Sequence, residues 1–133
     1  QDPSQLPAPL PPQVAHFSYV PFKALLPRLA ALVHHGGIGT TSQALLAGVP
    51  QLVRPMGFDQ FDNALRVLSL GVARRLLPRR YRPEAVAKAL DSLVTDPTVR
   101  ARCAEVARTL SAERPGTAVA ADALLALASR AGL

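Results

Sequence analysis

The sequence predicts an α/β fold in which a parallel sheet carries helices on both faces. Short apolar runs alternate with segments whose apolar residues recur at helical spacing, and this alternation leads into a helical C-terminal end. Strands joined by helices in this order pair in parallel through right-handed crossovers. The composition favours a folded domain, because 49% of the 133 residues are apolar and 18% are charged. We place this domain at residues 14–133, after a proline-rich linker at residues 1–13.

Each strand is predicted from a short run of apolar residues that is bounded by proline, glycine or another turn residue. We expect strands at residues 14–20, 29–33, 51–54 and 72–77. Helices are predicted from apolar periodicity and from stop and start signals. We expect a helical turn at residues 22–26, a helix at residues 40–47 that stops at Gly48, a helix from Asp59 to Gly71, and further helices beginning near Pro83, Pro97 and Pro115, with Thr117 as the last N-cap.

Apolar residues at helical spacing mark the predicted buried face of each later helix. In chain order they are Phe61, Ala64, Leu65 and Leu68, then Val86, Leu90 and Leu93, then Val99, Cys103, Val106 and Leu110, and last Leu124 and Leu127. Cys103 is the single cysteine, so an internal disulfide is excluded. We expect its thiol to pack as a small apolar group.

The charge balance limits the classes of partner. The 15 Lys and Arg against 9 Asp and Glu give a formal charge of +6, which fits nucleic acid, a membrane surface or an anionic small ligand. Aromatic residues make up only 5% and tryptophan is absent, so a nucleic-acid stacking surface is not expected. The arginines at residues 74–82 could make a weak contact with a membrane surface or a partner domain, but a solvated cluster is the simpler interpretation.

Other classes are excluded because their signatures are missing. No apolar run approaches the ~20 residues of a membrane span, and residues 1–12 do not resemble a signal peptide, so we expect a cytoplasmic protein. Cys103 and the histidines at positions 16, 34 and 35 lack the spacing of zinc ligands, so no metal is expected. No lysine follows the glycines in the pattern of a P-loop.

A glycine-rich turn at residues 36–39 carries most of the functional information. It follows a predicted strand and precedes the predicted helix start at Thr40, with Gln43 in the position of a capping-box partner. Such a turn gathers free N–H groups and the positive end of the helix dipole, so it is a ready anion site. His34 and His35 stand directly before it. We expect His34 to be structural and His35 to contact a ligand.

Three loops are expected to share one edge of the sheet. In parallel sheets, ligands bind beyond the carboxyl ends of the strands, beside the helix N-termini. The loops that would meet there are residues 19–21, 34–41 and 55–60. A ligand at this edge would therefore contact segments that are well separated along the chain.

These segments resemble the donor-binding half of nucleotide-sugar glycosyltransferases with the GT-B fold. The likeness is to plant natural-product and bacterial antibiotic or lipid glycosyltransferases. It is carried by VPFKALLPR (20–28), HHGGIGTTSQALLAGVPQLVRP (34–55) and DQFDNALRVLSLGV (59–72). The resemblance covers residues 14–77 well and the C-terminal helices weakly. It implies a Rossmann-like parallel sheet, the C-terminal half of a GT-B fold, with the first two strands of such a domain preceding Gln1.

The resemblance also implies a set of donor-binding residues. His35, Gly37, Ile38, Gly39 and Thr40 would bind the donor diphosphate, Gln43 the ribose, Asp59 and Gln60 the sugar hydroxyls, and Tyr19 with Val20 the base. The donor would be a UDP-sugar or a dTDP-sugar, with no metal or other cofactor. Plant members carry glutamate at the position of Gln43 and tryptophan at that of Tyr19, so the choice of base stays open. From the residues alone, Asp59 could equally cap its helix, and a capping-box role is favoured for Gln43.

In the family that the chain resembles, the acceptor site and the catalytic base lie in an N-terminal domain, so no catalytic residue is expected here. We expect the donor-binding part of an inverting hexosyltransferase, inactive alone, that serves a hydroxyl of a small-molecule or lipid acceptor. The alternative is a non-catalytic nucleotide-sugar-binding subunit of a split glycosyltransferase. A sheet without its central strand exposes an edge, so we also expect a homodimer through that edge.

Overall fold

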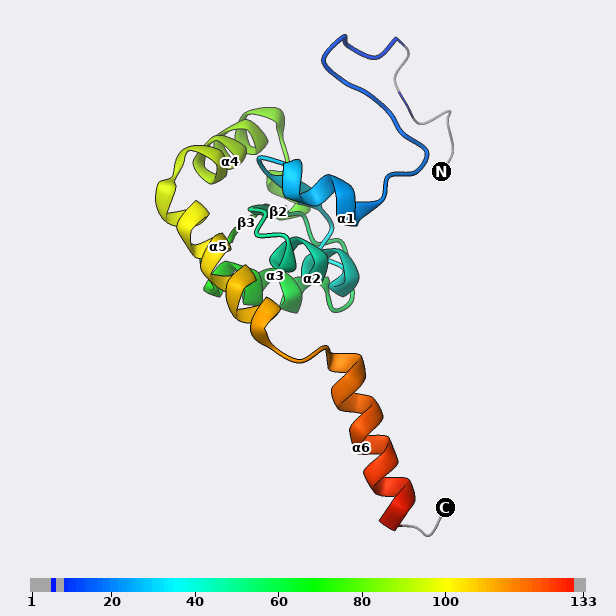
Figure 1. Cartoon of the computed structure of the whole chain (residues 1–133). Helices are drawn as coiled ribbons and strands as arrows, with labels where there is room; N and C mark the ends of the chain where they lie inside the picture. The colour runs from blue at the N-terminus through cyan, green and yellow to red at the C-terminus, as the bar shows by residue number, and fades with distance from the viewer. Residues whose placement is uncertain (1–5, 7–8, 131–133) are drawn as a thin grey trace.

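The computed structural model describes residue 6 and residues 9–130, and it contains a parallel three-stranded sheet (Figure 1). The strands are β1 (Leu32–His34), β2 (Gln51–Val53) and β3 (Ala73–Arg75), in that order across the sheet. Leu32 lies opposite Gln51, which lies opposite Ala73. The predicted α/β fold with a parallel sheet is confirmed. The predicted linker at residues 1–13 lies partly outside the described residues.

Helices connect and follow the strands. In chain order they are α1 (Phe22–Leu25), the 3-10 turn η2 (Leu26–Arg28), α2 (Ile38–Leu46), α3 (Gln60–Ser69), the 3-10 turn η3 (Pro78–Arg80), α4 (Pro83–Thr95), α5 (Pro97–Ala112) and α6 (Gly116–Arg130). Proline begins α4 and α5, where its fixed φ suits a helix and its missing N–H is not needed. Gly48 and Gly71 have φ of +67° and +76° just after α2 and α3, which confirms both predicted stops.

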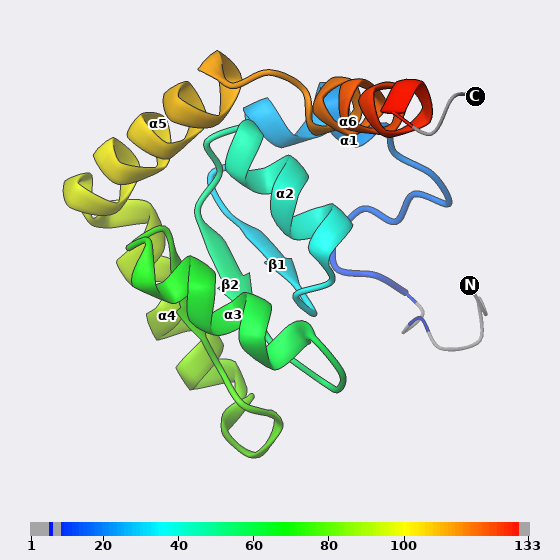
Figure 2. The ribbon, with the colours of Figure 1, turned by 90° about the horizontal axis from the view of Figure 1, so that it is seen from below.

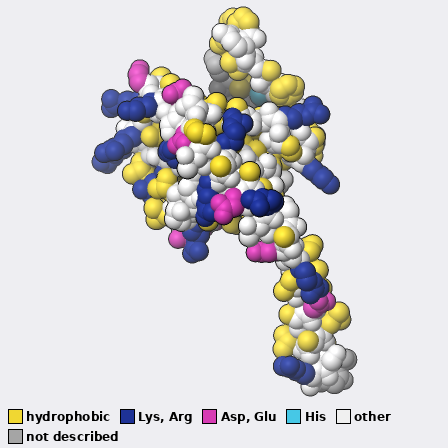
Figure 3. Space-filling view, turned by 60° about the vertical axis from the view of Figure 1, so that its left-hand side comes forward, with side chains coloured by type: hydrophobic (Ala, Val, Ile, Leu, Met, Phe, Trp, Pro, Cys, Tyr) yellow, Lys and Arg dark blue, Asp and Glu magenta, His cyan; other side chains and the backbone are white. Residues whose placement is uncertain are grey.

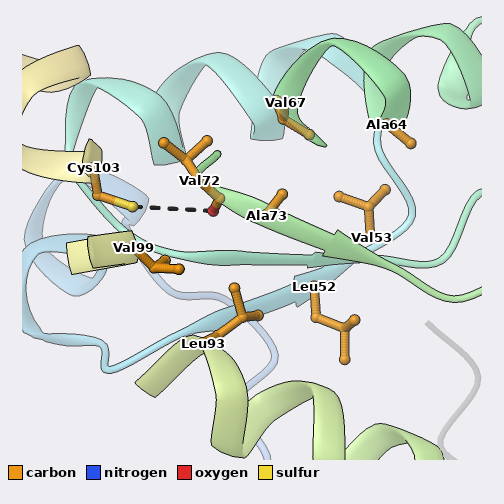
Figure 4. Close-up of a cluster of buried hydrophobic side chains, with 9 residues drawn as sticks. All are labelled: Leu52, Val53, Ala64, Val67, Val72, Ala73, Leu93, Val99 and Cys103. Atoms are coloured by element: carbon orange, nitrogen blue, oxygen red, sulfur yellow. Dashed lines mark hydrogen bonds between the residues drawn. The ribbon is translucent and has the colours of Figure 1, made fainter. Parts of the chain in front are cut away.

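The helices form a layer on each face of the sheet. α2 and α3 cover one face and α4 covers the other, while α5 packs against α2 and α4 (Figure 2). Figure 4 shows Leu52 of β2 pointing toward the side of Leu93 on α4, and Val53 pointing to the opposite side. Because successive strand residues alternate between faces and both faces are covered, β2 is buried along its whole length.

One buried cluster joins the two layers. It consists of Leu52, Val53, Ala64, Val67, Val72, Ala73, Leu93, Val99 and Cys103. The Cys103 sulfur lies 4.0 Å from the Val72 carbonyl oxygen, and burial raises the pKa of this thiol (Figure 4). Cys103 therefore packs as a small apolar group, as predicted. The predicted stripes of α4 and α5 are also confirmed, because Val86, Leu90 and Val106 pack against the cluster.

The strand expected at residues 14–20 is wrong. Residues 11–20 contain no helix or strand. Phe17 and Tyr19 are 66% and 80% exposed, so the alternating pattern has no neighbouring strand on which to pack. The next strand begins three residues later than predicted, because the Leu29 amide still donates to the Leu26 carbonyl oxygen at the end of η2 (3.1 Å). The remaining two strands lie within their predicted ranges.

The predicted buried face of α3 is confirmed at Ala64 and wrong at Phe61, Leu65 and Leu68. The residues that this helix buries are Asn63, Ala64 and Val67, about a third of a turn away from the predicted stripe. The stripe itself is solvent-exposed at Phe61, Leu65 and Leu68, by 40%, 49% and 38%. The buried face includes the polar Asn63, whose side chain donates to the Gly36 carbonyl oxygen (3.0 Å).

α6 extends away from the other elements and buries none of its residues (Figure 1). Leu124 and Leu127, which were predicted to be buried, are therefore 67% and 61% exposed. Figure 3 shows hydrophobic side chains along α6. Thr117 lies inside α6, since the helix begins at Gly116. Among the described residues, no helix is long and apolar enough to cross a membrane.

The carboxyl ends of the strands lie side by side. The His34 carbonyl oxygen at the end of β1 accepts from the Arg54 amide just after β2 (2.9 Å). The Val53 carbonyl oxygen accepts from the Leu76 amide just after β3 (3.0 Å). The loops after the three strands therefore start at one edge. β1 is an edge strand of the described sheet, with Val33 41% exposed, and the homodimer through this edge stays a prediction.

Leu52→Ala is expected to lower the free energy of unfolding by about 2–5 kcal/mol, because it leaves a cavity at a fully buried site between β2 and α4. Leu124→Ala makes the same chemical change on the exposed face of α6, and we expect a change of less than about 0.5 kcal/mol. Urea denaturation of the two variants and the parent chain measures both effects. Equal losses would contradict the exposed position of α6.

Candidate functional site

The turn between β1 and α2 consists of His35, Gly36 and Gly37. Gly36 is buried with a φ of +95°, a conformation that favours glycine. A Cβ at Gly36 would also lie 2.8 Å from Val53 Cγ1, so the turn sits directly against the end of β2. Gly37 is the N-cap of α2, with φ −62° and ψ 140°. The glycines therefore let the chain pass tightly from the sheet into the helix.

α2 begins two residues before the predicted start at Thr40. Its first residue is Ile38, because Gly37 already has the extended backbone of an N-cap. The predicted capping box between Thr40 and Gln43 is wrong as well. Gln43 Nε2 instead donates to the Gly39 carbonyl oxygen, one turn back along the helix (3.4 Å).

The first turn of α2 presents free backbone donors. The first helical hydrogen bond runs from the Thr41 amide to the Gly37 carbonyl oxygen (3.0 Å), and no side chain caps the helix. The amides of Ile38, Gly39 and Thr40 therefore have no acceptor within the part of the chain that the structure describes. These N–H groups and the positive end of the helix dipole are available to an anion.

The His35 imidazole lies against this helix end. His35 is exposed, and its Nε2 lies 2.7 Å from the position that a Cβ on Gly37 would occupy. Any side chain at position 37 would collide with the ring, so the glycine is needed for the ring to lie there. An exposed imidazole and the free amides are thus combined at one point on the surface.

His34 sits beneath the turn, partly buried, and it is held at both ring nitrogens. The Gly36 amide donates to His34 Nδ1 (3.1 Å), so the ring proton is on Nε2, which donates to Gln51 Oε1 (2.9 Å). Burial is the main cause that lowers the pKa of His34; the charge of His35 lowers it further, and the Gln51 hydrogen bond opposes both. This geometry agrees with the structural role expected for His34.

The loop before α3 brings Asp59 and Gln60 to the same edge. Asp59 is the N-cap residue of α3, but its side chain does not cap the helix, so the capping interpretation of Asp59 is wrong. Gln60 Oε1 accepts from the amides of Met56 and Gly57 (2.9 and 3.2 Å), so this side chain braces the loop. Sequence reasoning missed that brace. The amide nitrogen of Gln60 is the group that remains to donate to a ligand.

Asn63 joins the glycine turn to Asp59. Its Nδ2 donates both to the Gly36 carbonyl oxygen (3.0 Å) and to Asp59 Oδ2 (2.8 Å). A Cβ on Gly36 would also lie 3.2 Å from the Gln60 carbonyl oxygen, which confirms how closely the two loops approach. Sequence reasoning missed Asn63. The available signal was its position one helical turn after Asp59, on the same face of α3.

Tyr19, Val20 and Gln43 lie together at a surface hollow. The hollow has a volume of about 550 Å³ and is lined by Phe17, Ser18, Tyr19, Val20, Phe22, Leu25 and Gln43. Gln43 also borders a second hollow of about 390 Å³, beside Phe22 and Leu46. Gln43 connects this hollow with the first turn of α2, because its side chain donates to the Gly39 carbonyl oxygen. The structure thus brings together the residues predicted for base and ribose.

Arg54 follows β2 at the same edge of the sheet. It is partly buried, and its guanidinium carbon lies 5.0 Å from the centre of the Tyr81 ring. Arg74 is also engaged, since its Nε donates to Ser92 Oγ (3.1 Å) and it forms an ion pair with Asp96 (3.7 Å). The arginines at positions 79, 80 and 82 are exposed, as predicted. Basic side chains are spread over the face seen in Figure 3.

Within the described residues, no group of three or more His, Cys, Asp or Glu side chains could hold a metal ion. The side chains at the sheet edge are instead an imidazole, a carboxylate and an amide, beside backbone N–H donors. Such groups bind anionic oxygens and hydroxyls through hydrogen bonds.

The buried His34 predicts a pH dependence of stability. Its pKa in the folded chain lies below the ordinary value of 6.5, so the unfolded chain binds more protons below that pH. The free energy of unfolding should therefore fall as the pH drops from about 7 to about 5. His34→Gln should remove the contribution of His34 to this pH dependence. His16→Gln is the control and should keep it, because His16 is exposed. Urea denaturation from pH 7 to pH 5 measures the slope, and identical slopes in all three proteins would contradict the lowered pKa of His34.

Comparison with known proteins places this chain in a family. Residues 2–127 match the family described as "Erythromycin biosynthesis protein CIII-like, C-terminal domain". O-mycaminosyltylonolide 6-deoxyallosyltransferase of Streptomyces fradiae is 43% identical over 91 residues, which are 68% of this chain and 22% of that protein. Sterol 3-beta-glucosyltransferase of Candida albicans is 36% identical over 95 residues, 70% of this chain and 6% of that protein. The chain thus spans less than a quarter of the length of these two relatives.

Solved structures show the same relationship. The glycosyltransferase VinC, in complex with DTDP, superposes with a TM-score of 0.84 and 32% identity over 92% of this chain and 31% of VinC. CalG4, the calicheamicin glycosyltransferase, gives a TM-score of 0.82 and 31% identity over 95% of this chain and 33% of CalG4. The resemblance inferred from the motifs is confirmed. The chain belongs to the erythromycin biosynthesis protein CIII-like C-terminal domains of GT-B glycosyltransferases.

Proposed function

We propose that this chain is the donor-binding part of an inverting glycosyltransferase and that it binds a UDP-sugar or a dTDP-sugar at the carboxyl edge of its sheet. One observation carries the proposal: the uncapped first turn of α2 combines free amides with the exposed His35 ring and faces the loop of Asp59. The presence of DTDP in the VinC structure supports a nucleotide diphosphate as the ligand.

The diphosphate is the part of the donor that best fits this turn. The amides of Ile38, Gly39 and Thr40 donate to its oxygens, with each contact at a helix end stabilising by about 0.3–1 kcal/mol. The His35 imidazole adds a further donor. These hydrogen bonds strengthen as the glycosidic bond breaks, because negative charge develops on the leaving diphosphate. The turn therefore stabilises the leaving group more than the intact donor.

The two ends of the donor extend to either side of the diphosphate. On one side, the hollow next to Gln43 accommodates the nucleoside, with Tyr19 against the base and the Gln43 amide near the ribose hydroxyls. On the other side, Asp59 accepts hydrogen bonds from sugar hydroxyls, and the amide nitrogen of Gln60 donates to another.

Sugar transfer by this proposal needs groups outside this chain. An N-terminal domain supplies the acceptor site and a general base, which deprotonates an acceptor hydroxyl for direct displacement at the anomeric carbon. The acceptor is a small molecule or a lipid, and the chain alone binds the donor without turning it over. Relatives whose names give O-mycaminosyltylonolide and sterol as substrates support an acceptor of this kind.

Isothermal calorimetry with UDP, dTDP and uridine tests the proposal. We expect UDP or dTDP to bind, and uridine to bind at least about tenfold more weakly because it lacks the charged oxygens. His35→Ala should weaken nucleotide binding about 10- to 100-fold, the range expected when one hydrogen bond to a charged group is lost. His16→Ala is the matched control, since His16 is exposed and lies outside the site.

Two outcomes would contradict this function. Equal affinity for uridine and UDP would remove the diphosphate from the interaction. Unchanged binding in His35→Ala, with a normal far-UV spectrum, would show that the nucleotide binds elsewhere on the chain.

A further inference from the structure

We propose that Asn63 is a positioning residue that fixes both the peptide plane of the phosphate-binding turn and the carboxylate of Asp59. This inference rests on the proposed function and extends it. Asn63 is 8% exposed, and its Nδ2 donates to the Gly36 carbonyl oxygen (3.0 Å) and to Asp59 Oδ2 (2.8 Å). An amide nitrogen carries two hydrogens, so these two hydrogen bonds use its whole donor capacity.

The hydrogen bond to Gly36 decides where the next amide points. A trans peptide is planar, and its C=O and N–H point in opposite directions. Because the Gly36 carbonyl is directed inward at Asn63, the Gly37 N–H is directed away from Asn63, out of the protein interior. Gly37 has no acceptor for this N–H among the described residues. Asn63 thus adds a fourth backbone donor to those of Ile38, Gly39 and Thr40.

This turn needs an external clamp because its residues are glycines. Glycine adopts positive and negative φ about equally readily, so nothing in Gly36 or Gly37 prevents the peptide between them from flipping. Two side chains hold Gly36 instead: its amide donates to His34 Nδ1 (3.1 Å), and its carbonyl accepts from Asn63 (3.0 Å). A flip would bury the Gly37 N–H and turn a carbonyl toward the phosphate oxygens.

The second hydrogen bond of Asn63 orients the sugar-binding group. Asp59 Oδ2 is held by Asn63, which leaves Oδ1 to accept from a sugar hydroxyl. One amide group therefore sets the spacing between the diphosphate turn and the sugar carboxylate. A purely structural role for Asn63 would be to anchor α3 to the sheet edge, and the test must separate the two roles.

Three variants separate positioning from stability. Asn63→Ala removes both hydrogen bonds, and Asn63→Asp keeps the shape of the side chain but places oxygens against two acceptors. Val67→Ala is the matched control. Val67 is 2% exposed on the same helix, and its apolar side chain makes no hydrogen bond to either loop. Urea denaturation first ranks the variants by stability. Calorimetry with UDP, UDP-glucose and uridine then measures binding by those that fold.

We expect Asn63→Ala and Asn63→Asp each to weaken UDP and UDP-glucose binding by about tenfold or more, the loss expected for a hydrogen bond to a charged ligand. Uridine binding should stay within about twofold of the parent chain, since no diphosphate is involved. Val67→Ala should lose stability and keep all three affinities. If Asn63→Ala does not fold, Asn63→Asp carries the same expectation.

Parent-like UDP binding in a folded Asn63 variant would overturn the positioning role and leave the proposed function intact. Equal losses for UDP and uridine, or a loss in Val67→Ala as large as in Asn63→Ala, would also overturn it, since either would show a general effect of weakened packing. If the parent chain does not bind UDP at all, the proposed function fails first and this inference with it.

Discussion

Parallel pairing of β1 with β2 is the constraint on which the site depends. The register that sets Leu32 opposite Gln51 puts the end of β1 beside the loop after β2. Within that arrangement Gly36 packs against Val53, and Asn63 reaches across to the Gly36 carbonyl. A shift of one residue in the register would reverse every side chain on β1 and separate these groups. The geometry of the candidate site therefore follows from the sheet, and the loops supply its polar groups.

The elements that the sequence predicts well are those set by local chemistry. Proline at the start of α4 and α5, and glycine after α2 and α3, act within one turn of the chain, so their effects can be read without knowing the fold. A strand at residues 14–20 would need a neighbouring strand to pair with, and the alternation of residues does not show whether one is present. Apolar spacing does not identify the buried face of α3, because that face includes the polar Asn63, which donates to the distant Gly36 carbonyl oxygen.

The candidate site divides in the same way. The glycine turn and His35 are contiguous in the sequence, so the motif itself predicts an anion site. The hydrogen bond from Asn63 depends on where two loops meet, because Asn63 and Gly36 are 27 residues apart in the sequence. Spacing alone does not show such contacts. The stacking of Arg54 on Tyr81 is a similar case, since it joins the loops that follow two neighbouring strands.

The central claim is that bare amides at the start of α2 grip the diphosphate of a nucleotide. An NMR titration of the 15N-labelled chain with UDP tests it most directly, because each backbone amide reports separately. The account predicts that the largest shifts occur at the amides of residues 37–40, with smaller ones at Tyr19 and Gln43. Shifts concentrated at the exposed arginines of residues 79–82, with residues 37–40 unchanged, would contradict it.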